Sequence, residues 1–228
     1  VVNLTGSPSQ FPEKLMAVPG LGAVALTSED FARAQTYTAE TDRQASRAQA
    51  TNIDDFLVGL DLRLAITEPS AEQVERVAQM FTKTNQFNLT TKRYGTDDVV
   101  EMLADQNIEL VTTELSDRFG NYGLIGVAVL HHRQEETEID SLLISCRALG
   151  RRVEDGILAH LDQRARTRGA SRLMGLYKPT LKNVQVADLY PRFGFTAGDT
   201  QGVFVLDLNA SPALAFPSIM TINEPENG

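Results

Sequence analysis

The sequence contains one cysteine, Cys146, and no tryptophan among its 228 residues. A single cysteine excludes an internal disulfide framework and leaves too few thiolates for a structural zinc site, and it is typical of a reducing compartment. No apolar run approaches the roughly 20 residues of a membrane-spanning helix, and no basic-then-apolar signal segment is visible. The sequence therefore predicts a cytoplasmic protein with no membrane partner.

Positive charge is also scarce. The chain has 21 Lys and Arg against 30 Asp and Glu, which gives a net charge of −9. This balance argues against nucleic acid as the main partner. Hydrophobic residues make up 42% and charged residues 22% of the chain, as in ordinary globular proteins. The length suits one domain of roughly 150 residues with an extension.

The patterning of apolar residues divides the chain into three parts. Residues 1–60 predict an irregular and helical extension, with a short helix near 13–17 and a longer surface helix over 28–50. Residues 61–209 predict strand, helix, helix, three strands, helix, strand, helix, strand, which indicates an α/β fold with a mixed, partly antiparallel sheet flanked by helices. Residues 210–228 are polar and proline-containing and predict a flexible tail.

The stretch from Ile139 to Glu154 predicts a buried strand, a basic turn and the start of a helix. Its apolar run, Leu142 to Ile144, is typical of a strand covered on both faces. A strand that leads into a helix presents free backbone N–H groups and the positive end of the helix dipole, so the turn is a candidate phosphate site. The candidate phosphate ligands are Arg147, Gly150, Arg151 and Arg152. A solvated basic turn is the alternative.

Two local features, together with the order of elements, resemble the GNAT acyltransferases. Residues 147–152 resemble the GNAT pyrophosphate-binding turn R/Q-x-x-G-x-G/A, although Arg152 stands where a small residue is usual. Tyr190 precedes Gly194 and Phe195 as in the GNAT ending Tyr-x-x-x-Gly-Phe. The resemblance implies a GNAT-like domain over 61–209 in which Tyr190 protonates a departing thiolate. From the residues alone, a core tyrosine is an equal alternative.

A narrower resemblance covers about residues 11–208. It rests on Lys83–Tyr94 (KTNQFNLTTKRY), Ser145–Arg151 (SCRALGR), Lys182-Asn183 and Glu29-Asp30. These stretches look like the FkbH-like glyceryl transferase/phosphatase family of polyketide assembly lines. That family joins a phosphatase domain of the haloacid dehalogenase type to a GNAT-like half. It transfers a glyceryl group from an activated phosphoglyceryl donor to an acyl carrier protein.

The phosphatase half of that family is represented here only by its tail and linker, in residues 1–60. The Asp-x-Asp nucleophile loop and the later acidic pair that bind magnesium are both missing from the sequence. We therefore expect neither phosphatase activity nor a metal site in this chain. Whether the chain is fused to a phosphatase domain or to a larger synthase stays open.

Cys146 is the candidate nucleophile. The resemblance implies that its thiol carries the acyl group as a thioester and passes it to the phosphopantetheine thiol of the carrier protein. From the residues alone, a buried structural cysteine is the more frequent case. The resemblance also implies that Asn183 contacts the phosphopantetheine arm, whereas the residues alone allow a helix cap.

The candidate acyl-substrate pocket consists of Asn85, Gln86, Asn88 and Tyr122. The amide side chains can both donate and accept hydrogen bonds, as a hydroxylated acyl group requires, but they suit a well-bonded loop equally. A basic face at Arg164, Arg166 and Arg168 suits either an acidic carrier protein or solvent.

Two other functions stay open at this point. One is an N-acetyltransferase that uses acetyl-CoA, with coenzyme A in place of the phosphopantetheine of a carrier protein. The other is a non-catalytic docking module for a carrier protein. The identity of the acyl group and the oligomeric state are not predicted.

Overall fold

The structure is a computed structural model that describes Lys14 and residues 28–223. The helix predicted near 13–17 therefore lies outside the described residues, apart from Lys14. The chain divides into two compact units, residues 1–45 and 46–228, and the site lies in the second.

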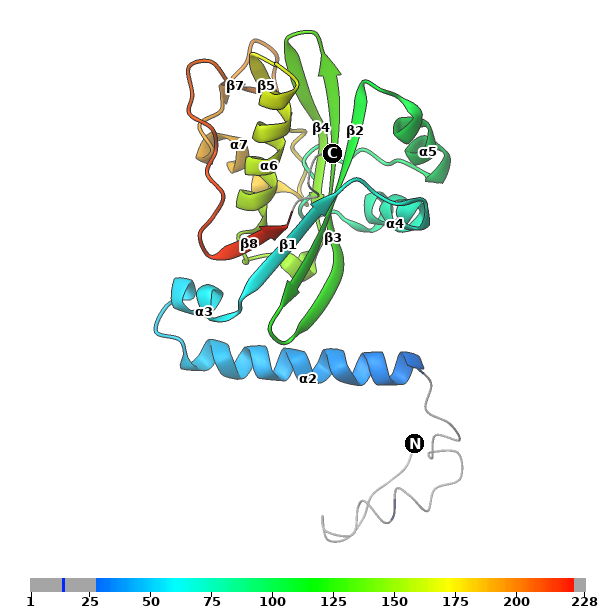
Figure 1. The fold of residues 1–228 in the computed structure, drawn as a ribbon, viewed down its shortest axis with the longest axis vertical. Helices are drawn as coiled ribbons and strands as arrows, with labels where there is room; N and C mark the ends of the chain where they lie inside the picture. The colour runs from blue at the N-terminus through cyan, green and yellow to red at the C-terminus, as the bar shows by residue number, and fades with distance from the viewer. Residues whose placement is uncertain (1–13, 15–27, 224–228) are drawn as a thin grey trace. The chain divides into compact units, whose positions relative to one another are not determined.

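Figure 1 shows the elements in chain order. The described α-helices are α2 (Ser28–Gln49), α3 (Ile53–Gly59), α4 (Val74–Lys83), α5 (Thr96–Ala104), α6 (Val153–Thr167) and α7 (Leu189–Arg192). The described 3-10 helices are η2 (Ala71–Gln73), η3 (Cys146–Ala148) and η4 (Val184–Val186). The described strands are β1 (Leu62–Thr67), β2 (Ile108–Asp117), β3 (Gly120–Arg133), β4 (Glu136–Ile144), β5 (Arg172–Leu176), β6 (Thr196–Ala197), β7 (Val203–Asp207) and β8 (Met220–Asn223).

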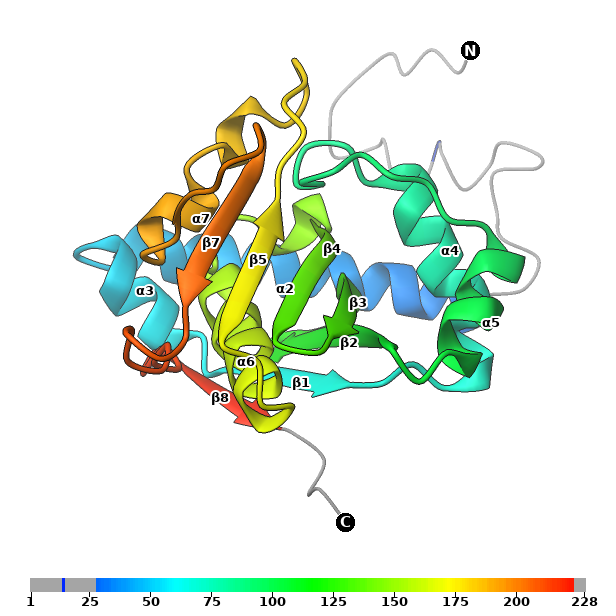
Figure 2. The same cartoon turned by 90° about the horizontal axis from the view of Figure 1, so that it is seen from above.

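The strands form one mixed sheet in the order β6-β7-β5-β4-β3-β2-β1-β8. The β4–β5 and β1–β8 pairs are parallel, and the other neighbours are antiparallel. Figure 2 shows the sheet from above, with β5 beside β4. The predicted mixed α/β fold is confirmed.

Helices cover both faces of this sheet, with α4 and α5 on one face and α6 on the other (Figure 1). Alternate residues of β3 supply the two cores, as a period of two requires. Ala128 and Leu130 belong to the core that includes α6, whereas Val127 and Val129 belong to the core that includes α4 and α5. Burial on both faces explains the uninterrupted apolar run at the end of β4.

The β4 and β5 strands pair only as far as Ile139 and Gly175. Just beyond, Asp140 is an extra residue in the β3–β4 ladder, a bulge between Ile139 and Ser141. Bulges bend a strand and redirect its side chains. The second half of β4 thus leaves β5 and presents a separate edge, which positions the site described below.

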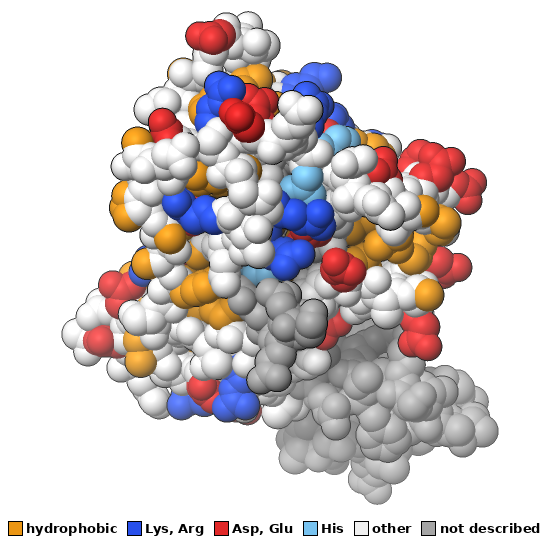
Figure 3. All heavy atoms as spheres, turned by 45° about the horizontal axis from the view of Figure 1, so that its top comes forward, with side chains coloured by type: hydrophobic (Ala, Val, Ile, Leu, Met, Phe, Trp, Pro, Cys, Tyr) orange, Lys and Arg blue, Asp and Glu red, His pale blue; other side chains and the backbone are white. Residues whose placement is uncertain are grey.

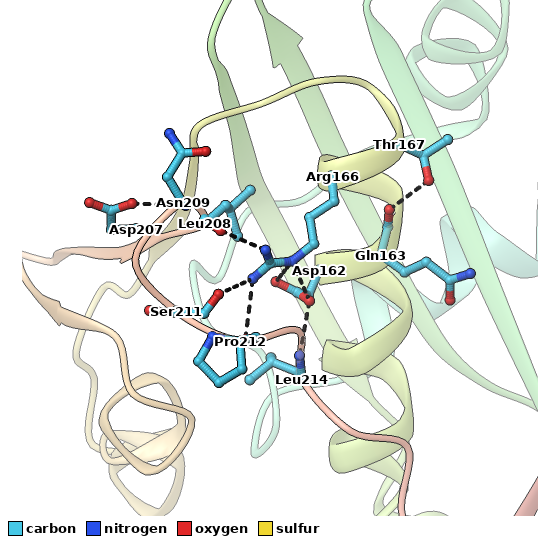
Figure 4. Close-up of polar contacts among 10 residues, drawn as sticks. All are labelled: Asp162, Gln163, Arg166, Thr167, Asp207, Leu208, Asn209, Ser211, Pro212 and Leu214. Carbon is cyan, nitrogen blue, oxygen red and sulfur yellow. Dashed lines mark hydrogen bonds and ion pairs between the residues drawn. The ribbon is translucent and has the colours of Figure 1, made fainter.

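The predicted flexible tail is wrong for Met220–Asn223, because these residues form β8 beside β1. Figure 4 shows how the chain between β7 and β8 is fixed to α6. Arg166 donates to the carbonyl oxygens of Leu208, Ser211 and Pro212 and pairs with the buried Asp162 at 3.0 Å. Asp162 also accepts a hydrogen bond from the backbone N–H of Leu214. The sequence pattern did not reveal these long-range contacts.

The predicted boundary at residue 60 also differs from the structure. The second compact unit begins at Ser46, so α3 belongs with the sheet. Leu57 and Leu60 are buried in the same core as β1 and α6. Their side chains are too apolar to leave in solvent, which explains why α3 packs on the domain.

The Asp162→Ala substitution is expected to lower the free energy of unfolding by about 3 kcal/mol, since it leaves Arg166 without its buried partner. Urea unfolding measures this loss, and hydrogen exchange should show faster exchange of β8 amides. Arg63→Ala, which breaks the exposed pair with Asp61, is the control and should cost less than about 1 kcal/mol. Equal losses in the two variants would contradict the assigned role.

A second buried carboxylate, Glu109 of β2, joins the sheet to α6. It lies 3.0 Å from Nε2 of His132 and 2.6 Å from Nε of Arg164, and Arg168 approaches it at 3.8 Å. Burial alone would raise the pKa of Glu109, but the hydrogen bonds to His132 and Arg164 outweigh it and lower the pKa from 4.5 to about 2. Figure 3 shows Lys, Arg and His side chains gathered in the middle of the face it draws. All three arginines of the predicted α6 basic face, Arg166 included, thus pair with carboxylates.

A lowered pKa in the folded state means that Glu109 stabilises the fold above about pH 5 and that this contribution is lost as the pH falls toward 2. The loss is about 3 kcal/mol for a shift of this size. Glu109→Gln should remove this part of the pH dependence in urea unfolding between pH 5 and 2. Glu101→Gln, at an exposed position of α5, is the control and should leave the profile unchanged.

Candidate active site

Cys146 is exposed on η3, directly after β4. The turn is held to the sheet because the backbone N–H of Ser145 donates to the carbonyl of Ile125 at 2.7 Å. The Ser145 hydroxyl caps η3 and accepts from the N–H of Arg147. The structure thus presents the only cysteine to solvent on a fixed turn, so the alternative of a buried structural cysteine is wrong.

The Cys146 side chain lines a cavity of about 460 Å³, a size suited to a small ligand. The lining residues come from α4, from the segment after it and from the end of β4. They are Arg76, Gln79, Met80, Lys83, Thr84, Asn85, Gln86, Phe87, Ile144, Ser145, Cys146 and Arg147. The cavity therefore brings together four predicted site residues: Cys146, Arg147, Asn85 and Gln86.

The α4 residues of this cavity were missed by the sequence argument. Arg76, Gln79, Met80 and Lys83 follow the spacing i, i+3, i+4, i+7, which places them on one side of a helix. A mixed polar and apolar stripe at this spacing, next to the buried stripe of Val77 and Phe81, was the available signal. It could not be assigned without knowing what faces α4.

The segment after α4 is held in place by Arg93. Its guanidinium donates to the carbonyl oxygens of Phe81 and Thr84 and, at 2.5 Å, to the side-chain oxygen of Asn85. The Phe81 and Thr84 carbonyls lie in the last turn of α4 and at its C-cap, where they lack helical partners. Arg93 therefore orients Asn85 at the cavity.

Asp140, at the β4 bulge, anchors the same segment from the other side. It accepts hydrogen bonds from Lys92 and, at 2.8 Å, from the hydroxyl of Tyr94. Burial raises the pKa of Asp140, but the bonds to Lys92 and Tyr94 outweigh it, and the net pKa is lowered. Burial and the bond to Asp140 raise the pKa of Tyr94. The KTNQFNLTTKRY stretch therefore contributes to the anchor as well as to the cavity.

Phe87 to Leu89 lie along the separate edge of β4. The Leu89 N–H donates to the carbonyl of Leu142 at 3.1 Å, and the Ile144 N–H donates to the carbonyl of Phe87 at 2.9 Å. On the other side, the N–H of Lys178 donates to the carbonyl of Leu89. This short extended stretch thus fills the opening between the ends of β4 and β5.

Asn88 and Asn183 are fully buried and do not line the cavity. The Asn183 amide donates to the carbonyls of Asn88 and Lys178, and its oxygen accepts from the N–H and hydroxyl of Thr180. All four hydrogen-bonding positions of this side chain are used within the protein. In this structure Asn183 fastens the loop after β5 to the segment beside β4.

The basic turn separates into two parts. Arg147 faces the cavity, whereas Arg151 stacks over Tyr122 and donates to its hydroxyl at 3.1 Å. Arg152 pairs with Asp155 at 2.8 Å. Gly150 and Arg152 have positive φ angles of 74° and 58°, a conformation that glycine adopts easily and arginine does not. Tyr122 and the turn beyond Arg147 lie outside the cavity lining.

Tyr190 is 1% exposed, and its ring packs on Gly175 so closely that no Cβ could be added there. Burial raises the pKa of Tyr190, so the phenol stays protonated. Tyr190 does not line the cavity with Cys146.

Solved structures that are similar to this chain include several acetyltransferases. A putative acetyltransferase of the GNAT family from Desulfovibrio desulfuricans matches with a TM-score of 0.51 and 14% identity, over 64% of this chain and 99% of that one. A putative acetyltransferase from Salmonella typhimurium, solved with its cofactor acetyl-CoA, has a TM-score of 0.48 and 16% identity over 67% and 98% of the two chains. An N-acetyltransferase from Staphylococcus aureus has a TM-score of 0.48 and 15% identity over 64% and 98%.

The match with the Desulfovibrio structure establishes that this chain has a GNAT-like fold. No protein-family model matches the chain, and no curated protein sequence matches it.

This fold raises the question of whether coenzyme A fits. An arm with its pyrophosphate on the 147–152 turn and its thiol at Tyr190 would run along β4 beyond Ile139. That edge already pairs with Phe87–Leu89, whose three residues are each at most 4% exposed. The residues present therefore do not fit a pantetheine arm on that path, whereas the cavity at Cys146 is open.

Among the described residues, no helix is long and apolar enough to cross a bilayer. The same residues contain no group of three or more His, Cys, Asp or Glu side chains arranged to hold a metal ion.

Asn183→Ala is expected to destabilise the protein by about 2 kcal/mol, because the buried carbonyl of Asn88 and the part-buried carbonyl of Lys178 lose their donor. Urea unfolding measures the loss, and the amide of Leu89 should exchange faster with solvent. Gln185→Ala, at an exposed position of the same loop, is the control. An unchanged exchange rate at Leu89 in Asn183→Ala would contradict the fastening role.

Proposed function

We propose that this protein is an acyltransferase in which the thiol of Cys146 accepts the acyl group. The observation that carries the proposal is the position of the only cysteine, exposed at the wall of a 460 Å³ cavity in a GNAT-like fold. A thiol at the wall of a cavity can reach a bound carbonyl carbon, which a packed thiol cannot.

The proposed step forms a bond between the Cys146 sulfur and the acyl carbon of an acyl phosphate, and it breaks the bond from that carbon to the phosphate oxygen. Phosphate leaves with the electron pair, and the thiol proton passes to solvent. In the second step, an acceptor thiol takes the acyl group and returns a proton to the Cys146 sulfur. Exchange of one thioester for another has little thermodynamic cost.

For the finer identity of the reaction, we propose glyceryl transfer to the phosphopantetheine thiol of an acyl carrier protein. The support is the sequence resemblance together with the polar lining of the cavity. Gln79, Thr84, Asn85 and Gln86 offer donors and acceptors for a hydroxylated acyl group, and Phe87 and Ile144 offer apolar surface.

The second candidate is an acetyl-CoA-dependent N-acetyltransferase. The fold favours it, since the Desulfovibrio structure is described as a putative acetyltransferase of the GNAT family. It requires no cysteine. Coenzyme A, like the phosphopantetheine arm of a carrier protein, requires a path other than the β4 edge that Phe87–Leu89 fills. The third candidate, a docking module, has no observation of its own.

Incubation of the full chain with the glyceryl thioester of N-acetylcysteamine, a soluble pantetheine mimic, tests the proposal. Intact-mass measurement should show one glyceryl adduct on the protein and none on Cys146→Ala. Because the chain has one cysteine, loss of the adduct in Cys146→Ala is enough to assign it to the Cys146 sulfur. Absence of the adduct at saturating thioester would contradict acyl capture.

Titration with acetyl-CoA separates the two candidates. The cysteine mechanism predicts no saturable acetyl-CoA binding by calorimetry and no acetylation of amines. The second candidate predicts binding and amine acetylation that Cys146→Ala leaves unchanged. Circular dichroism of the variant verifies that the fold is retained.

A further inference from the structure

Three basic side chains surround the cavity beside Cys146. Arg76 and Lys83 come from the side of α4, and Arg147 comes from η3. Among the side chains that the structure describes, no Asp or Glu lines this cavity. The cavity is therefore positive, although the protein as a whole has a net charge of −9.

The hydrogen bonds of the two arginines go to neutral acceptors. Arg76 Nη1 donates to the side-chain oxygen of Gln79 at 3.2 Å. Arg147 donates to the Ser145 hydroxyl at 3.4 Å and to the carbonyl of Leu124 at 3.2 Å. Within residues 38–223, no salt bridge involves either arginine or Lys83.

Two part-buried arginines of α6, in contrast, have carboxylate partners. Arg164 pairs with Glu109, and Arg166 pairs with Asp162. The cavity thus differs from α6 in having cations but no counter-ion among the side chains that the structure describes. Side chains with this arrangement attract an anion from solution.

The two arginines are also close enough to repel each other. Burial lowers the pKa of Arg147, and the positive charge of Arg76 lowers it further, while Cys146 acts in the opposite direction. A bound anion between the guanidinium groups would relieve this repulsion. Guanidinium forks match the geometry of phosphate and carboxylate oxygens.

We propose that the cavity beside Cys146 contains a binding site for a small oxyanion, formed by Arg76 and Arg147 with Lys83 at its rim. If the proposed function holds, the anion is a phosphate or carboxylate group of the acyl donor. Only this identity of the ligand rests on the proposed function; the anion site itself does not. The site places that charged group next to the thiol. Anion binding itself requires no reaction at Cys146.

The first experiment compares alkylation of Cys146 by iodoacetate and by iodoacetamide, which differ in charge. Mass spectrometry gives both rates, since the chain has one cysteine. Removal of one nearby positive charge by Arg76→Gln should lower the iodoacetate-to-iodoacetamide rate ratio by roughly three- to tenfold at low salt. Arg63→Gln, an exposed arginine on β1, is the matched control and should leave the ratio unchanged.

The second experiment measures binding of inorganic phosphate and of acetate to the full chain by NMR titration. Arg76→Gln should weaken binding of the preferred anion by roughly tenfold, and Arg63→Gln should not. The preferred probe identifies the anion as phosphate or carboxylate. Cys146→Ala should bind it as well as the unsubstituted protein does.

The outcomes separate this inference from the proposed function. An unchanged rate ratio and unchanged anion affinity in Arg76→Gln would overturn the anion site, whether or not Cys146 is acylated. Loss of anion binding in Arg76→Gln, with no glyceryl adduct on the unsubstituted protein, would support the anion site and contradict acyl capture.

Discussion

The pairing of Phe87–Leu89 with the free edge of β4 is the contact on which the rest of the site depends. The β4 strand leaves β5 at the Asp140 bulge, so its last residues need another partner for their backbone groups. The segment after α4 supplies that partner. Once it is placed there, the residues just before it, Asn85 and Gln86, face Cys146 across the cavity.

Two buried polar groups keep this segment in position. Asp140 binds it through Lys92 and Tyr94, and Asn183 binds the carbonyl of Asn88. Each is buried and well bonded, so a substitution at either would leave its hydrogen-bonding partners without that bond, which costs stability. The same pairing that builds the cavity wall also fills the opening between β4 and β5. The chain therefore has the GNAT-like fold, with a filled opening between β4 and β5 and an open cavity on the side of α4.

Much of the fold was readable from the residue pattern. Leu62, Leu64 and Ile66 alternate with more polar residues, a pattern typical of a half-buried strand, and all three are buried in β1. Ser70 and Gln73 have the spacing of a capping box, which is typical of a helix start, and the Gln73 side chain accepts from the Ser70 N–H. The strand β8 was missed, because a four-residue edge strand after a proline-containing stretch has no periodic signal. Its position depends on Arg166 and Asp162, which are far from it in the chain.

The sequence by itself determined the order of the longer helices and strands from β1 to β7, the one available thiol and the turn that carries it, since these follow from periodicity, capping and composition over short distances. Only the tertiary structure decided which polar residues meet that thiol. Asn85 and Gln86 reach the cavity, whereas Asn88, two residues further, is buried in the β4 pairing. Arg147 faces Cys146, but Arg151 and Arg152 turn to Tyr122 and Asp155. Side-chain direction at these positions depends on strand register and on the bulge at Asp140, both set by contacts between distant parts of the chain.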